Sequence, residues 1–216
     1  MIIYIPIKHN SQRVHRKNFR VFNGEPLYKH TLLKYSNHRV FVDTDSQEIF
    51  DGIRNDNRLS HTKVYKRCDD RIGDNISVCL LLERFIEKFN IDEPFAQIHV
   101  TSPFLKETTL VNAYSKLHEG YDSIVSCNIH QSRFWRKENY GMCPINHNPV
   151  KLEQTQDLSA IYEENSCFYI MEPNIIYFGN RIGRNPLFYP INKIESIDID
   201  TEEDWGYATQ ISRTYN

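Results

Sequence analysis

The chain has 216 residues and a formal net charge of −2, and 40% of its residues are hydrophobic. This length favours a single domain with a substantial core, and the near-neutral charge excludes the strongly basic surface typical of nucleic-acid-binding proteins. No apolar stretch is long enough to span a bilayer, and the apolar N-terminal run is too short for a signal peptide. We therefore expect a cytoplasmic protein without nucleic-acid or membrane partners.

Hydrophobic patterning predicts alternating strands and helices over the first two-thirds of the chain. The predicted strands are Ile2–Ile7, Arg39–Asp43, Thr62–Lys66, Phe95–Val100 and Asp122–Cys127. The predicted helices are Pro26–Tyr35, a helix capped by Ser46 that runs to about Asn57, Asn75–Phe89 and Glu107–His118. Such alternation is typical of an α/β fold with a mostly parallel sheet and helices on both faces. In sheets of this kind, ligands bind beyond the carboxyl ends of the strands.

The alternation breaks over residues 128–162, where prolines, asparagines and histidines replace the periodic pattern. We interpret residues 128–162 as an excursion from the sheet that serves as a flap, an oligomer arm, or both. The pattern then resumes with a strand at Ser166–Met171, a short helix after Pro173, short strands at Leu187–Pro190 and Ser196–Ile199, and a helix that begins at Thr201. We treat residues 1–216 as one domain.

The five cysteines also favour a reducing compartment. Their number is odd, and no two of them have CxxC spacing. Buried free thiols explain this pattern better than a disulfide framework or a metal site. The nine histidines show no HxH or HExxH spacing, so the sequence gives no reason to infer zinc.

The loop that follows the first strand is strongly basic. Its cations are Lys8, Arg13, Arg16 and Lys17, and its other polar residues include Asn10, Ser11 and Gln12. A nucleoside triphosphate carries about four negative charges and is bound by several cations and N–H donors. A solvated basic turn is the alternative, but a position after the first strand of a parallel sheet favours phosphate binding. The loop is not a Walker A motif, because no glycine precedes Gly24.

Two carboxylates, Asp198 and Asp200, alternate with isoleucines in the predicted strand near the C-terminus. On a strand, both would point to the same face. Neighbouring carboxylates repel each other unless a cation lies between or beside them. Magnesium held by one or two protein carboxylates and by substrate phosphates is the expected use of such a pair. Helix capping by Asp200 and Thr201 is the alternative, and it leaves Asp198 unexplained.

Two weaker polar clusters also follow predicted strands. Val42–Asp45 ends the second strand, and there a ligand role and helix capping by Asp45 or Ser46 are about equally supported. Thr101-Ser102-Pro103 follows the fourth strand, where its hydroxyls would face a ligand. Together with the basic loop and the carboxylate pair, these clusters indicate phosphoryl or nucleotidyl transfer.

These residues resemble the cytidylyltransferases that activate acidic sugars, namely the CMP-sialic acid synthetases and their relatives for pseudaminic, legionaminic and KDO-type acids. The resemblance runs through nearly the whole chain, and Ser-Ile-Asp-Ile-Asp-Thr is its most specific motif. The segments that carry it are Ile5–Asn18, Gly24–Leu27, Val42–Asp45, Arg67 with Asp74, Thr101–Pro103, Ser123–Ser126, Asn165–Ile170 and Ser196–Asp200. It implies a three-layer α/β sandwich with the Rossmann-like fold of the nucleotide-diphospho-sugar transferases.

The resemblance also implies an activity. Such an enzyme joins CTP to an acidic 2-keto sugar, releases pyrophosphate and forms a CMP-sugar, with Mg²⁺ as cofactor. The anomeric hydroxyl of the sugar would attack the α-phosphate in line, while magnesium and cationic side chains neutralise charge on the phosphates. Members of this family are usually homodimers, and residues 128–162 stand where the family has the element that reaches into the partner's active site.

The family motifs assign roles to individual positions. The implied catalytic residues are Lys8, Arg13, Lys17 and Asp200, and the implied metal ligands are Asp198 and Asp200. The implied nucleotide-binding residues are Ile5, Pro6, Lys8, Asn10, Ser11, Lys17, Arg67 and Asp74. The implied substrate-binding residues are His99, Thr101, Ser102 and Asn165.

Several positions depart from the family pattern. Lys8 stands in place of an arginine, which removes a bidentate fork, whereas Arg13 matches an arginine of the KDO-type synthetases. His99-Val100 occupies the place of a Gln-Pro pair. Glu163-Glu164 stands where sialic acid synthetases have Arg-Pro, so a cation is missing from the expected sugar pocket. The identity of the sugar stays open, as do two alternatives: a nucleotidyltransferase with another acceptor, such as a sugar or polyol phosphate, and a nucleotide-binding protein that has lost catalysis.

Overall fold

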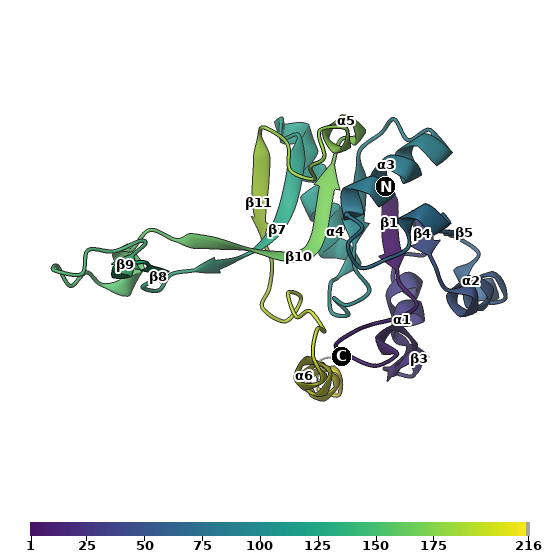
Figure 1. The fold of residues 1–216 in the computed structure, drawn as a ribbon, viewed down its shortest axis with the longest axis horizontal. Coiled ribbons are helices and arrows are strands. Elements are labelled where there is room, and N and C mark those ends of the chain that lie inside the picture. Colours follow the sequence, from purple (N-terminus) through teal and green to yellow (C-terminus); the bar gives the residue numbers. More distant parts are fainter. Residues whose placement is uncertain (215–216) are drawn as a thin grey trace.

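The computed structural model describes residues 1–214, and the last two residues of the predicted domain, 215–216, lie outside the described part. A seven-stranded sheet with the order β11-β7-β10-β6-β1-β4-β5 forms its centre (Figure 1). These strands are β1 (Ile2–Ile7), β4 (Arg39–Thr44), β5 (Thr62–Lys66), β6 (Phe95–Ile98), β7 (Ser123–His130), β10 (Ile161–Met171) and β11 (Pro186–Pro190). Neighbouring strands are parallel except around β10, which runs antiparallel to both β6 and β7. The predicted mostly parallel α/β sheet is confirmed.

The central strand β1 divides the core between the two faces of the sheet. Ile3, Ile5 and Ile7 pack on one face with helices α1 (Leu27–Leu33), α2 (Gln47–Arg54) and α4 (Glu107–Ser115). Ile2 and Tyr4 pack on the other face with α3 (Val78–Phe89) and α5 (Pro173–Ile176). Because successive side chains point to opposite faces, a strand buried on both faces has a continuous apolar sequence. The result is the three-layer sandwich that the resemblance implies.

Side-chain caps determine where the helices begin. Ser46 accepts a hydrogen bond from the backbone N–H of Ile49 and caps α2, as predicted. Thr201 forms a capping box with Asp204 at the start of α6 (Glu202–Ser212), the helix that was predicted to begin at Thr201. Helix α3 begins later than the predicted Asn75, because Ser77 is the residue that caps it. A side-chain oxygen at this position satisfies an N–H group that has no partner within the helix.

The strand predicted at Ser196–Ile199 is wrong. The chain turns over residues 193–196 and continues through residues 197–200 without regular secondary structure. Ile199 is buried in a separate cluster with Phe22 and Trp205, which lies under α6. Its N–H donates to the carbonyl oxygen of Thr101 at 2.9 Å. An extended segment with one buried side has the same alternating pattern as a strand, and here it reaches burial without a ladder of strand pairs.

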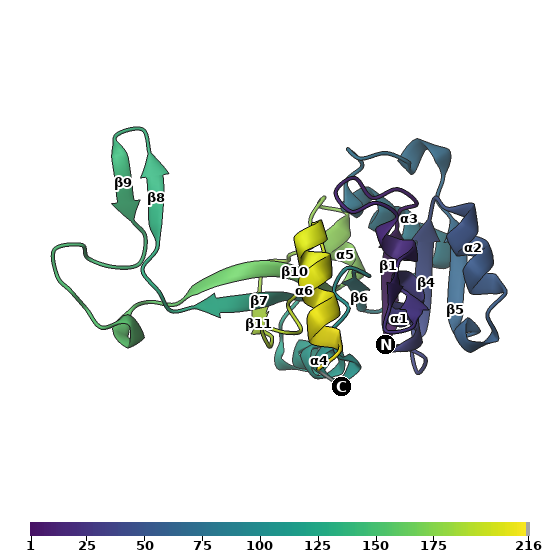
Figure 2. The ribbon, with the colours of Figure 1, turned by 90° about the horizontal axis from the view of Figure 1, so that it is seen from below.

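Strands β7 and β10 extend beyond the sheet as a long arm (Figures 1 and 2). At its far end, β8 (Trp135–Glu138) pairs antiparallel with β9 (Gly141–Pro144). Residues 128–130 and 161–162 of the predicted excursion therefore belong to β7 and β10. The arm exposes several large apolar side chains, those of Trp135, Met142, Ile145, Val150 and Leu152.

The remaining elements are short. The strands β2 (Val21–Phe22) and β3 (Glu25–Pro26) form a small hairpin before α1. Five 3₁₀ turns complete the described chain: η1 (Lys17–Phe19), η2 (Asn57–Leu59), η3 (Asp69–Arg71), η4 (Lys116–Glu119) and η5 (Thr155–Asp157). None of the helices within residues 1–214 has the length and apolar character needed to cross a membrane. All five cysteines are free.

Candidate active site

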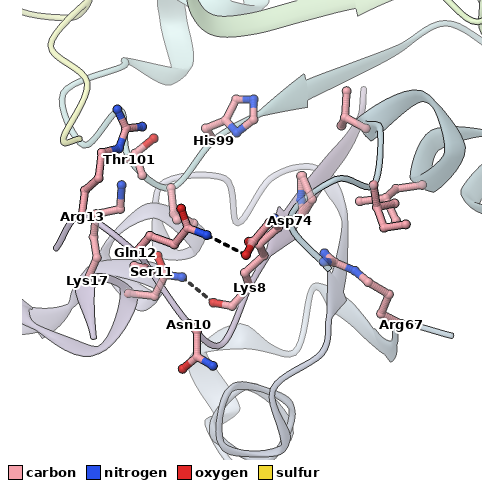
Figure 3. A pocket seen from close by; sticks show the side chains of 16 residues that line it. Lys8, Asn10, Ser11, Gln12, Arg13, Lys17, Arg67, Asp74, His99 and Thr101 are labelled. Carbon is pink, nitrogen blue, oxygen red and sulfur yellow. Dashed lines mark hydrogen bonds and ion pairs between the residues drawn. The ribbon is translucent and has the colours of Figure 1, made fainter. Parts of the chain in front are cut away.

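A pocket of about 410 Å³ lies beyond the carboxyl ends of β1 and β6 (Figure 3). One wall is the first loop, which we define as residues 8–18. The opposite side is formed by the end of β6 and by the segment that leads from β5 into α3. The lining residues are Pro6, Lys8, Asn10, Ser11, Gln12, Arg13, Lys17, Asn18, Arg67, Asp74, Ile76, Val78, Leu81, His99, Val100 and Thr101. Most of the residues that the sequence implies for the site thus line a single cavity.

Asp74 connects the first loop to the opposite wall. Its carboxylate lies 3.3 Å from Lys8 Nζ and accepts a hydrogen bond of 2.6 Å from Gln12 Nε2. Lys8 Nζ also donates to the carbonyl oxygen of Gly73 at 3.1 Å. The side chains of Lys8 and Asp74 are 41% and 64% exposed, so this ion pair is worth only about 0–1 kcal/mol. A phosphate entering the pocket therefore competes with Asp74 for the ammonium group at little cost.

The first loop is anchored from behind by polar side chains. Asn18 Nδ2 donates to the carbonyl oxygen of Lys8 at 2.7 Å. The N–H of His9 donates to Asp45 Oδ1 at 2.6 Å, and the imidazole of His9 lies 2.8 Å from the hydroxyl of Ser46. At the end of the second strand, Ser46 therefore caps helix α2, and Asp45 binds the backbone of the first loop. These bonds position the loop cations at the pocket.

Arg67 forms a buried ion pair at the base of the pocket. Its Nε donates to Asp43 Oδ1 at 2.6 Å, and only 1% of its side chain is exposed. Tyr4 donates to the other carboxylate oxygen of Asp43 at 3.3 Å, and burial raises the pKa of this phenol well above its usual value. Arg67 lines the pocket as expected, but Asp43 offsets its charge. The arginine therefore shapes the wall more than it offers a free cation.

Asp200 lies between two cations of the first loop. Arg13 Nη2 is 2.8 Å from Asp200 Oδ2, and Lys17 Nζ is 3.5 Å from Asp200 Oδ1. Lys17 also donates to the carbonyl oxygen of Ile199. The segment in front of α6 therefore adjoins the pocket wall formed by the first loop, although it is not a strand.

Asp198 lies close enough to Asp200 for their charges to interact. Burial raises the pKa of Asp198, and the negative charge of Asp200 raises it further. Its Oδ1 atom is buried and has no hydrogen-bond partner. A buried carboxylate oxygen without a partner, beside a second carboxylate, fits a divalent cation ligand. Within residues 1–214, no group of three or more His, Cys, Asp or Glu side chains is arranged to hold a metal, so further ligands would come from substrate phosphates and water.

Besides Asp198 and Asp200, which adjoin the pocket without lining it, three residues implied for the site lie off the pocket wall. Ile5 is fully buried in the core, where its side chain contacts other apolar residues instead of a ligand. Ser102 is buried as well, with 2% exposure. Asn165 belongs to β10, and its Nδ2 donates to Oδ1 of Asn128 on β7 at 3.2 Å. His99 and Thr101 do line the pocket. Of the four residues implied for substrate binding, two therefore lie at the pocket and two, Ser102 and Asn165, lie outside it.

Other residues of the pocket have no assigned role in the sequence motifs. Ile76, Val78 and Leu81 give the wall an apolar part, and they come from the approach to α3 and its first turn. In the sequence, their spacing has the period of a helix that faces the core, so it carries no signal for a ligand. Gln12 and Asn18 act through their hydrogen bonds to the opposite wall and to the loop backbone. The partner of Gln12, Asp74, is remote in the sequence, and the partner of Asn18 is the backbone carbonyl of Lys8. The sequence therefore carries no signal for either contact.

A mostly parallel sheet with a basic pocket at its carboxyl edge defines a nucleotide-binding α/β protein. The sequence matches the family model for cytidylyltransferases over residues 2–214. The chain therefore belongs to the cytidylyltransferase family, which confirms the resemblance drawn from its motifs.

Relatives of known name are distributed across vertebrates and bacteria. The chain is 29% identical to N-acylneuraminate cytidylyltransferase A of Danio rerio over 93% of its own length, and it spans 48% of that longer protein. It is 27% identical to CMP-N,N'-diacetyllegionaminic acid synthase of Legionella pneumophila, with 98% of the chain and 95% of the relative covered. Pseudaminic acid cytidylyltransferase of Campylobacter jejuni is 22% identical, with 94% and 92% covered.

Solved structures share the fold at low sequence identity. A CMP:2-keto-3-deoxy-manno-octonic acid synthetase complexed with CTP superimposes with a TM-score of 0.70 at 11% identity, covering 100% of this chain and 99% of that one. A 4-diphosphocytidyl-2C-methyl-D-erythritol synthase has a TM-score of 0.68 at 11% identity, with 97% and 96% covered. These likenesses confirm the predicted Rossmann-like nucleotidyltransferase fold.

Proposed function

We propose that the protein joins CTP to an acidic 2-keto sugar of the sialic, legionaminic, pseudaminic or KDO type, and that it releases pyrophosphate and a CMP-sugar. The observation that carries this proposal is the ion pairing of the basic first loop with Asp200 next to one pocket, with the buried carboxylate of Asp198 close to Asp200. Three relatives are named for the transfer of cytidylyl groups to acidic sugars or the synthesis of their CMP derivatives.

In this proposal the first loop binds the triphosphate of CTP. Lys8, Arg13 and Lys17 all line the pocket, and each already contacts an oxygen atom that a phosphate oxygen can replace. Asn10 and Ser11 add uncharged polar groups on the same wall. Charge-assisted hydrogen bonds of this kind stabilise the negative charge that builds up on the pyrophosphate leaving group.

Asp198 and Asp200 are the proposed ligands of Mg²⁺. When bound, the metal would supply Lewis-acid polarisation of the phosphate oxygens. Before the phosphates bind, Lys17 and Arg13 hold Asp200 beside the first loop. The apolar patch at the start of α3 and the buried Arg67 would contact the nucleoside, which leaves His99 and Thr101 for the acceptor sugar.

We also propose a homodimer formed through the arm of β7 to β10. The support is the exposed apolar surface of the arm, where Val150 and Leu152 are 94% and 89% exposed. Large exposed apolar patches mark interaction surfaces.

The five free cysteines support a reducing compartment such as the cytoplasm.

Pyrophosphate release tests the proposed activity. The protein is incubated with Mg²⁺, each of the four nucleoside triphosphates and N-acetylneuraminic, legionaminic, pseudaminic or KDO acid. We expect release with CTP and with one class of acid. Release with a sugar phosphate or polyol phosphate instead would identify another acceptor. CTP binding by calorimetry without release on any acceptor would identify a protein that has lost its chemistry.

A further inference from the structure

Arg181 lies in the segment between α5 and β11, outside every motif discussed above. Its Nη1 donates to Gln97 Oε1 at 3.2 Å. Its guanidinium lies over the ring of Tyr169, 3.7 Å from the ring centroid. None of the ion pairs formed by residues 1–214 involves Arg181. A positively charged, oriented side chain without an anionic partner is therefore present beside the sheet.

Arg181 is connected to the pocket through two residues of the β6 region. Gln97 is paired with Tyr169 across β6 and β10, and Gln97 Nε2 lies 2.9 Å from His99 Nε2. His99 lines the pocket, and Figure 3 shows its imidazole away from Lys8 and Asn10, the side chains of the phosphate-binding wall. The contacts thus run from the pocket through Gln97 to the guanidinium.

These contacts determine which nitrogen of His99 carries the proton. Arginine only donates hydrogen bonds, so the oxygen of the Gln97 amide must face Arg181. The NH₂ group of Gln97 then faces His99 and donates to its Nε2. The imidazole is therefore neutral and carries its proton on Nδ1. Burial lowers the pKa of His99 to about 4, which agrees with this neutral form.

We propose that Arg181 binds the carboxylate of the acidic sugar and that His99 donates a second hydrogen bond to the sugar from its Nδ1–H. This inference rests on the proposed function. The guanidinium uses one hydrogen bond on Gln97 and has further N–H groups for a carboxylate. Stacking on Tyr169 holds the plane of the guanidinium, which favours a bidentate contact.

The same assignment accounts for the cation that is missing from Glu163-Glu164. Glu163 is occupied, because its carboxylate accepts from Asn128 and lies 2.7 Å from His130 Nε2. Glu164 accepts from the hydroxyl of Tyr169, the residue on which Arg181 stacks. Neither acid takes part in an ion pair with Arg181 among the described residues. A cation from the α5–β11 segment thus takes the role that the dipeptide has lost.

A comparison of two substrates on two proteins tests the contact. The substrates are the sugar acid that the wild-type protein uses best and the carboxamide made from the same acid. The proteins are wild type and Arg181→Gln. In the wild type, we expect the KM for the carboxamide to exceed that for the acid by about 10- to 100-fold. In Arg181→Gln, the KM for the acid should rise by a similar factor, while the values for the carboxamide and for CTP stay unchanged.

Arg184→Gln is the matched control, because Arg184 lies on the same segment and is exposed. It should retain the wild-type KM for every substrate. An equal rise in KM for acid and carboxamide in Arg181→Gln would show a merely structural role and would overturn the inference, as would an unchanged KM for the acid. If the wild-type protein releases no pyrophosphate with any sugar acid, it is the proposed function that fails.

Discussion

Arg13 and Asp200 form an ion pair of 2.8 Å that joins the first loop to the segment in front of α6. The two side chains are 66% and 38% exposed, so the pair contributes only about 0–1 kcal/mol to stability. Lys17 contacts the same carboxylate from a more buried position, with 12% of its side chain exposed. The main consequence of this arrangement is therefore chemical: two cations and a carboxylate are held together beside the pocket.

Asp200→Asn tests the proposed metal site. The substitution removes a negative charge without changing the size of the side chain, so the fold should persist while magnesium binding weakens. We expect kcat to fall by at least about 100-fold, a loss comparable to that of other groups that stabilise charge in a transition state. Pyrophosphate release at increasing Mg²⁺ measures kcat, and thermal unfolding checks the fold.

Glu202→Gln is the control for this experiment, because Glu202 is exposed, follows closely in the chain and pairs with Arg20. It should change turnover little. If Asp200→Asn kept turnover near that of the wild type, Asp200 would not be a ligand of the catalytic metal.

The ion pair of Arg67 and Asp43 is expected to act on stability. Its side chains are 1% and 3% exposed, and removing one partner leaves a buried charge without compensation. Arg67→Met or Asp43→Asn should each lower the free energy of unfolding by about 3–5 kcal/mol. Urea unfolding of both variants and of the double variant measures the coupling. Losses that simply add in the double variant would mean that the two side chains do not stabilise each other.

The arm of β7 to β10 provides the prediction for assembly. Val150→Ser with Leu152→Ser removes two exposed apolar side chains whose burial is worth about 1.5–3 kcal/mol each. We expect the wild-type chain of 25.7 kDa to be a dimer by light scattering and the double variant to dissociate at concentrations at least about 100-fold higher.

Phe178→Ser serves as the matched control for the arm, because Phe178 is 82% exposed but follows α5 on the body of the protein. This variant should stay dimeric. A wild-type protein that is monomeric at all concentrations would exclude the proposed dimer, and a double variant with unchanged dissociation would exclude Val150 and Leu152 from its interface.

The fold was largely predictable because its sheet is buried on both faces. The apolar run of Ile2–Ile7 and the pattern of Thr62–Lys66 coincide with β1 and β5. A strand and an extended segment with one buried side share a period of two residues, so the pattern alone did not reveal that Ser196–Ile199 lacks a pairing partner. The missing information is the position of a neighbouring strand, which local sequence does not contain.

The candidate site was predictable where residue type carries the chemistry. The basic first loop and the two aspartates stand out by charge, and the structure brings Arg13 and Asp200 together. The contact between Gln97 and Arg181 could not be predicted from the sequence. Gln97 belongs to a predicted strand, and Arg181 lies in a polar stretch without periodicity. Their roles emerge only when β6, β10 and the α5–β11 segment are placed side by side.

His99 makes stability depend on pH in a defined direction. Burial, followed by the positive charges of Arg181 and Lys17, lowers its pKa to about 4, although the negative charge of Asp200 opposes this shift. Between about pH 4 and pH 6.5 the unfolded chain therefore binds a proton at this residue that the folded protein does not. Stability must fall as the pH drops through this range.

We expect His99→Gln to remove this part of the pH dependence. His30 and His38 also have lowered pKa values because of burial, so they act with the same sign and remain in the variant. The informative quantity is the difference between variant and wild type in the free energy of urea unfolding at pH 7 and pH 5. Relative to the wild type, the variant should be more stable at pH 5 than at pH 7, by at most about 2 kcal/mol. His118→Gln replaces an exposed imidazole and serves as the control. If this difference were the same at pH 7 and pH 5, His99 would be protonated to the same extent in the folded and the unfolded protein. That result would contradict the neutral form required by its contact with Gln97.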